Sequence, residues 1–223
     1  MGRYFAGLDL GQLQDFTALV IAEQTDDQPR TYKIGYLERF PLGTHYNIVG
    51  DHLAKLMQMA PFKDNTTIIA DATGCGLPVV QELQRRRPGR DLRGQLLRPI
   101  RPEDILAPII PVLITAGDAV SFDQESGTWH TAKRELASRL QVLIQNRRVT
   151  VSAELPEAKT LTNELLAFRP KVTPAGNVVF DTWRESIHDD TVLAAALALW
   201  YGEKFGGPPR RFSVPFVWAP SGV

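Results

Sequence analysis

Four aspartates of this sequence stand where a carboxylate is energetically costly. Asp9 lies in the middle of the first apolar run, Asp71 ends a later apolar run, and Asp189 and Asp190 precede an alanine- and leucine-rich segment. A buried carboxylate destabilises a protein unless a cation or several hydrogen-bond donors meet it. If two strands and the start of a helix bring these side chains together, they repel one another unless divalent cations lie between them. Oxygen-only ligands of this kind suit Mg²⁺ or Mn²⁺ rather than zinc.

Such a set of carboxylates predicts phosphodiester hydrolysis. Two divalent cations held roughly 3.5–4 Å apart are the usual machinery for the in-line attack of water on a phosphodiester, because one activates the water and the other stabilises the leaving oxygen. Taken singly, the aspartates also have structural explanations. Asp71 could accept hydrogen bonds from turn amides, and Asp189 or Asp190 could cap a helix. Asp9 lacks such an explanation, since aspartate is disfavoured within strands.

The elements that must position these residues follow from hydrophobic periodicity. Along the strand expected over 4–11, Phe5, Gly7 and Asp9 share one face, and the apolar run 17–22 forms an antiparallel hairpin with it. A helix that starts at Asp189 or Asp190 is apolar almost all round, which predicts that it is buried. The remaining patterns predict strands over 30–40, 66–71 and 94–100, a hairpin over 171–180, and helices over 44–60 (capped by Thr44), 78–85, 131–146 (with Leu136, Leu140, Leu143 and Ile144 on its apolar side) and 156–168.

Composition limits the class of protein. The length of 223 residues favours one domain, over 1–204, followed by an extended tail over 205–223. The 25 basic and 25 acidic residues cancel, which argues against binding nucleic acid by bulk charge alone. A single cysteine excludes an internal disulfide, and no apolar stretch has the length of a membrane span, so we expect a soluble intracellular protein. Two arginine clusters are candidates either for DNA phosphate contacts or for solvated helix ends: Arg85, Arg86 and Arg87, and Arg147 and Arg148.

Four motifs occur in order along the sequence. They are Gly7-x-Asp9-x-Gly11-x-x-x-Asp15-x-Thr17-Ala18, Asp71-Ala72-Thr73-Gly74-x-Gly76, Trp129-x-x-x-Lys133-x-x-Leu136 with Leu161-x-x-Glu164-Leu165, and His188-Asp189-Asp190. Together they resemble a known family, the nuclease domain of the large terminase subunit of tailed bacteriophages, and the resemblance runs from about Gly7 to Trp200.

The resemblance implies an α/β protein with an RNase H-like fold, related to RuvC-type resolvases: a mixed β-sheet flanked by helices, with an added β-hairpin. It implies a metal-dependent endodeoxyribonuclease that cuts concatemeric phage DNA during genome packaging, with Asp9, Asp71, Asp190 and Asp189 holding two divalent cations. Adjacent helical residues point about 100° apart, so only one of the last pair can face the metals squarely. We expect Asp190 to do so, with Asp189 in an outer role. Asp15, Lys133 and His188 match family positions near the site and are candidates for supporting roles.

The implied partners are double-stranded DNA, the terminase ATPase motor domain, the small terminase subunit and the portal, in the cytoplasm of the bacterial host. This sequence lacks the G-x-x-x-x-G-K-[ST] phosphate loop of such a motor. It is therefore interpreted either as an excised nuclease domain or as a separate nuclease polypeptide. Two other interpretations stay open: an actin- or sugar-kinase-like ATP-binding domain, which also begins with an Asp-x-Gly strand, and a non-catalytic RNase H-like docking module. Metal-dependent cleavage of plasmid DNA distinguishes both from a nuclease.

Overall fold

Strand β1 (Arg3–Asp9) is the centre of the fold, and its alternating side chains divide the interior into two cores. Phe5 packs into one core, whereas Ala6 and Leu8 pack into the other. The alternation predicted for this strand is therefore confirmed, and it places Asp9 on the same face as Phe5. The computed structural model describes residues 2–11, 15–74, 76–117, 119–167, 171–172, 178–179 and 189–206.

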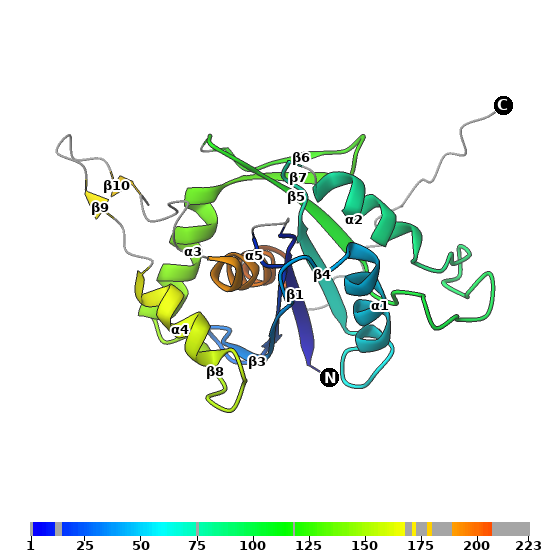
Figure 1. Ribbon diagram of the computed structural model, residues 1–223, viewed down its shortest axis with the longest axis horizontal. Coiled ribbons are helices and arrows are strands. Elements are labelled where there is room, and N and C mark those ends of the chain that lie inside the picture. Colours follow the sequence, from blue (N-terminus) through cyan, green and yellow to red (C-terminus); the bar gives the residue numbers. More distant parts are fainter. Residues whose placement is uncertain are drawn as a thin grey trace.

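The described residues form one mixed sheet of eight strands, in the order β6-β7-β5-β4-β1-β2-β3-β8 (Figure 1). Strand β1 pairs antiparallel with β2 on one side and parallel with β4 on the other, so the carboxyl ends of β1 and β4 meet at one edge of the sheet. The strands that join β1 in this sheet are β2 (Ala18–Gln24), β3 (Tyr32–Arg39), β4 (Thr66–Asp71), β5 (Ile109–Thr115), β6 (Ser121–Asp123), β7 (Thr128–Ala132) and β8 (Val149–Val151).

Helices cover both faces of the sheet, which confirms the predicted layers. Helices α1 (Tyr46–Met57) and α2 (Gly76–Arg85) lie on one side, as Figure 1 shows. On the other side lie α3 (Lys133–Gln145), α4 (Ala158–Ala167) and α5 (Asp190–Phe205). Strands β9 (Lys171–Val172) and β10 (Val178–Val179) pair as the added hairpin. No helix in the described part of the chain is long and apolar enough to cross a membrane.

Helix α5 is buried against β1 and β2, as its apolar sequence predicts. Two glycines allow the close approach. A Cβ added at Gly7 would lie 1.8 Å from the carbonyl oxygen of Ala194 in α5, and one at Gly202 would lie 2.8 Å from the ring of Tyr32. Any side chain at Gly7 would therefore push the helix off the strand.

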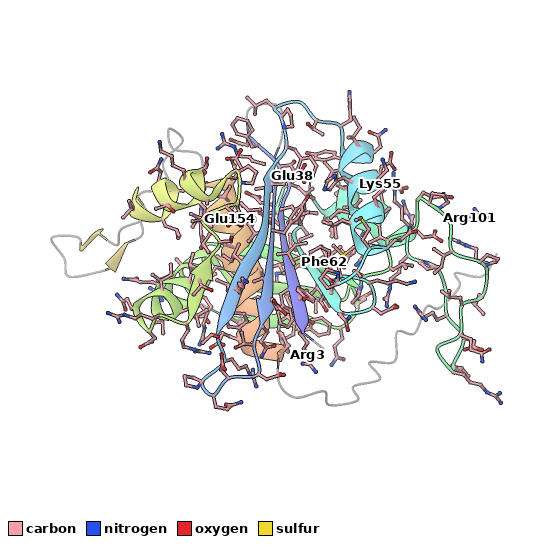
Figure 2. The ribbon with its side chains drawn as sticks, turned by 90° about the horizontal axis from the view of Figure 1, so that it is seen from below. Arg3, Glu38, Lys55, Phe62, Arg101 and Glu154 are labelled. Atoms are coloured by element: carbon pink, nitrogen blue, oxygen red, sulfur yellow. The ribbon has the colours of Figure 1, made fainter. Side chains whose placement is uncertain are left out.

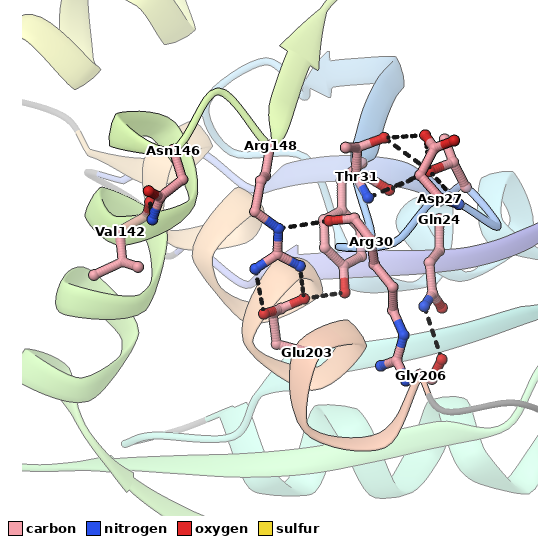
Figure 3. A network of polar contacts seen from close by, with 11 residues as sticks. Gln24, Asp27, Arg30, Thr31, Val142, Asn146, Arg148, Glu203 and Gly206 are labelled. Carbon is pink, nitrogen blue, oxygen red and sulfur yellow. Dashed lines mark hydrogen bonds and ion pairs between the residues drawn. The ribbon is translucent and has the colours of Figure 1, made fainter.

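Polar contacts hold the carboxyl end of α5 in place (Figure 3). Arg148 donates two hydrogen bonds to Glu203, Nη1 to Oε2 at 2.9 Å and Nη2 to Oε1 at 2.7 Å, and the Tyr32 hydroxyl donates a third at 2.8 Å. Gln24 donates to the carbonyl oxygen of Gly206 at 2.7 Å. Although burial acts to raise the pKa of Glu203, the hydrogen bonds from Arg148 and Tyr32 leave it lowered. These contacts give Arg148 a structural role, and the DNA contact suggested by its sequence stays a prediction.

The prediction of a strand over 94–100 is wrong. That segment forms turns, apart from one isolated bridge. The Asp91 carboxylate accepts hydrogen bonds from the amides of Arg93 and Gln95, which folds the chain back on itself, and Pro99 has no amide hydrogen to give to a sheet. The segment 101–129 is rich in proline and apolar residues without a clean period, and it contributes β5, β6 and the start of β7.

Some predicted helix details are also wrong. Thr44 does not cap α1: its hydroxyl donates to the carbonyl oxygen of Pro41 at 2.6 Å, and His45 takes the N-cap position. Helix α3 begins at Lys133 because the two preceding residues belong to β7. Ile144 is 40% exposed, so it does not share the buried side of α3.

Candidate active site

Asp9 and Asp71 lie at the carboxyl ends of two neighbouring parallel strands. The register pairs Leu8 of β1 with Ala70 of β4, which brings the following residue of each strand to the same edge. The Asp71 carboxylate also accepts a hydrogen bond from the Thr73 amide at 2.8 Å. Asp71 therefore has the turn-forming role that aspartate often plays.

Helix α5 brings the second pair of carboxylates to this edge. Asp190 is its first residue and is 5% exposed. Asp189 occupies the N-cap position, but its side chain makes no capping hydrogen bond. The capping explanation considered for Asp189 is therefore wrong. Lys133, the first residue of α3, completes the group, with its Nζ 3.9 Å from Oδ2 of Asp189.

Electrostatic interactions join these residues into one cluster, which we call the aspartate cluster: Asp9, Asp71, Asp189 and Asp190. Burial raises the pKa of Asp9 well above its ordinary value, and the charges of the other three members raise it further, while Lys133 opposes them. Burial also raises the pKa of Asp71, against the Thr73 hydrogen bond and Lys133. Burial lowers the pKa of Lys133, while the carboxylates of the cluster counteract that shift.

The chemistry of the aspartate cluster fits Mg²⁺ or Mn²⁺, since every donor is a carboxylate oxygen. Among the residues that the structure describes, no three histidine, cysteine or acidic side chains are already gathered around one point as a coordination group. Repulsion among the carboxylates adds to burial in raising the pKa of Asp9. A divalent cation would relieve it.

The roles of the other predicted site residues stay predictions. Asp15 is exposed, and it is not among the groups that shift the pKa of Asp9. His188 lies outside the described residues. Arg85 pairs with Glu82 at the end of α2, opposite the end that follows Asp71.

The remaining arginines of the two clusters also lie at helix ends. Arg86 pairs with Asp51 of α1 at 2.7 Å. Arg87 is exposed as a whole residue. Partial burial of its guanidinium and the charge of Arg90 nevertheless lower its pKa. Arg147 is exposed just beyond α3. None of these residues is among the groups that shift the pKa of Asp9.

Sequence reasoning missed the role of Glu164. It lies in α4, is 8% exposed, and accepts hydrogen bonds from the first turn of α5, beside Asp190. The signal was present, because Glu164 belongs to one of the four motifs, but the motif does not say what the carboxylate contacts.

The sheet and the edge that carries these carboxylates define the class of domain. Three consecutive antiparallel strands followed by parallel strands, with helices on both faces, form the RNase H-like fold. Solved structures of terminase nucleases share it, so the resemblance stated from the sequence is confirmed at the level of the fold. The sequence matches no protein-family model and no curated relative.

Three of these structures show how far the similarity extends. The large terminase nuclease of the thermophilic phage G20c, determined with bound magnesium, is 24% identical with a TM-score of 0.55, over 89% of this chain and 80% of that one. The g2p large terminase nuclease domain of bacteriophage SPP1, with bound Mn, is 13% identical with a TM-score of 0.52, over 91% and 86%. The manganese-soaked human cytomegalovirus terminase nuclease domain is 11% identical with a TM-score of 0.52, over 90% and 83%.

Proposed function

We propose that this chain is a metal-dependent endodeoxyribonuclease that cuts concatemeric phage DNA during genome packaging. The observation that carries the proposal is the convergence of Asp9, Asp71, Asp189 and Asp190 from two strands and a helix at one sheet edge. Two further facts support it: the fold is shared with terminase nucleases, and structures of such nucleases were determined with magnesium or manganese.

The aspartate cluster would hold two divalent cations, which when bound supply an activated water and stabilise the leaving oxygen of the phosphodiester. Asp9 interacts electrostatically with all three other carboxylates, so we propose it as the central ligand of the set. Asp71 offers the oxygen that Thr73 leaves free of its amide contact. Asp190, the more buried of its pair, faces the centre, and Asp189 takes an outer place beside Lys133.

Lys133 brings a positive charge to the aspartate cluster. Its Nζ lies 3.9 Å from Asp189, and its interactions extend to Asp9 and Asp71. In the metal-free protein the ammonium partly neutralises the carboxylates. With metals bound, the same group can attract the phosphate of a DNA strand to the sheet edge.

We also propose the wider setting that the resemblance implies. The chain acts on double-stranded DNA in the cytoplasm of the bacterial host, together with a terminase ATPase motor domain, a small terminase subunit and the portal. In support, the HK97 bacteriophage large terminase contains this fold as part of a longer chain: the similarity covers 90% of this chain and 39% of that one, at a TM-score of 0.52.

The test is plasmid cleavage by the purified chain. We expect nicking and linearisation with Mn²⁺ or Mg²⁺ and none with excess chelator, and we expect Asp9→Asn and Asp71→Asn each to abolish cleavage while the protein stays folded. Full activity in chelator, or in either variant, would overturn the proposed function. A folded chain that binds DNA but never cuts it would favour the docking module instead.

A further inference from the structure

Glu164 is a buried carboxylate of α4 that contacts the first turn of α5, next to Asp190. We infer that Glu164 is a positioning residue, which sets the first turn of α5 and thereby aims Asp190 at the other carboxylates of the aspartate cluster. The inference rests on the proposed function, because it assigns a residue that prepares the same metal site.

The contacts of Glu164 account for the start of α5. Its Oε2 accepts from the amides of Thr191 at 3.1 Å and Val192 at 3.2 Å, and from the Thr191 hydroxyl. The first amides of a helix have no carbonyl partners inside the helix, so a side chain usually caps them. Asp189 does not do so. The cap instead comes from Glu164 in α4.

This cap acts directly on Asp190. The Thr191 amide that Glu164 holds belongs to the peptide group formed with Asp190, so fixing that amide fixes the backbone from which the Asp190 side chain projects. Gly7 seats the same helix on β1 four residues further along, at Ala194. One contact sets the position of the helix and the other sets the direction of its first turn.

Glu164 also links α5 to the loop that follows Asp9. Its Oε1 lies 3.6 Å from Nη1 of Arg39, at the end of β3, and the Arg39 guanidinium lies 3.9 Å from the centre of the Phe16 ring. Phe16 lies in the connection between β1 and β2, so these contacts run from α5 through Glu164 to the segment that follows the strand of Asp9.

Glu164 is not itself a candidate ligand, because it is not among the groups that act on Asp9. Burial raises its pKa, and the hydrogen bonds from Thr191 and Val192 and the charge of Arg39 oppose that shift. A buried carboxylate that only stabilised the fold could be removed with a loss of stability alone. A positioning residue must change metal affinity in molecules that remain folded.

The test compares Glu164→Ala, Glu164→Gln and Thr191→Val with the matched control Glu154→Gln, an exposed glutamate before α4 (Figure 2). Mn²⁺ affinity is measured by calorimetry and by the electron paramagnetic resonance spectrum of bound Mn²⁺, well below each melting temperature. Plasmid cleavage is followed against Mn²⁺ concentration, so that half-saturation and maximal rate are separated.

We expect Glu164→Ala to weaken Mn²⁺ binding and raise half-saturation by about 10-fold or more, as is usual when residues that orient metal ligands are removed. Glu164→Gln keeps an acceptor oxygen, so its Mn²⁺ affinity should lie between those of Glu164→Ala and the parent chain. Thr191→Val should weaken Mn²⁺ binding by less than Glu164→Ala does. The control Glu154→Gln should bind Mn²⁺ as tightly as the parent. If Glu164→Ala does not fold, Glu164→Gln and Thr191→Val decide. Unchanged Mn²⁺ affinity in the folded variants, with only a lower melting temperature, overturns the inference but not the nuclease. A parent chain that neither binds Mn²⁺ nor cuts DNA overturns the proposed function itself.

Discussion

Replacing Gly7 by alanine should separate the two halves of the active site without touching a proposed ligand. The new Cβ would lie 1.8 Å from the Ala194 carbonyl oxygen, whereas ordinary contacts begin at 3.4 Å, so α5 and β1 must move apart by the difference, about 1.6 Å. Both neighbours are backbone, so no side chain can rotate away to make room. Asp190, at the start of α5, would then move relative to Asp9.

Two losses follow from a shift of that size. Forcing an extra carbon into a packed interior costs about 1–3 kcal/mol of unfolding free energy. Misplacing reacting groups by about 1 Å can cost about 100-fold in rate. We therefore expect Gly7→Ala to lower the urea midpoint and to reduce plasmid cleavage by roughly 100-fold per folded molecule, on the scale of such misplacements.

The matched control is Gly35→Ala in β3, where an added Cβ meets nothing within 4 Å. It should keep the parent's cleavage rate and stay within about 1 kcal/mol of the parent's stability, since glycine is a weak strand former. Parent-like stability and cleavage in Gly7→Ala would refute the argument that helix approach sets the site.

The remaining predictions concern the charges. Burial and neighbouring carboxylates raise the pKa of Asp9. Ionisation of Asp9 therefore destabilises the metal-free fold as the pH rises from about 4 through that raised pKa. Asp9→Asn should therefore raise the melting temperature in chelator at pH 7.5 but not at about pH 4, and should abolish stabilisation by Mn²⁺; equal melting temperatures at pH 7.5 would contradict the raised pKa. Arg148→Met should lower the unfolding free energy by about 2–3 kcal/mol by stranding Glu203, yet leave cleavage per folded molecule unchanged, because Glu203 is near the opposite end of α5 from Asp190. Reversing charge at Arg85, Arg86 and Arg87 should weaken DNA binding more at low salt than at high salt; unchanged low-salt affinity would make them solvated helix ends.

Local patterns in the sequence were enough for the elements that build the site. Alternation placed Asp9 and Gly7 on the face that α5 covers, and the run before Asp71 predicted β4 with its carboxylate at the strand end. The all-round apolarity of 192–200 predicted a buried α5. These features depend on residues close together in the chain, since side-chain direction follows from a period of two in strands and 3.6 in helices.

Longer-range features depended on contacts that no local pattern records. Asx-type hydrogen bonds of Asp91 turned the predicted strand 94–100 into a loop, and residues of the segment without a period became β5 and β7 by pairing with β4 and with each other. Arg148 looked like half of a basic cluster, but 55 residues along the chain Glu203 takes up its charge. Strand pairing and ion pairing between distant segments are set by the packed fold.

The sequence by itself determined which residues carry charge and which elements present them: Asp9 in a strand, Asp71 at a strand end, and Asp190 at a helix start. Only the tertiary structure decided that these ends meet, and that Glu164 from another helix caps α5 in place of Asp189. The physical reason is that capping and carboxylate repulsion act through space. Which groups cap a helix or repel one another depends on how α4 and α5 pack on the sheet. The local sequence determines only which side chains each helix or strand places on each of its faces.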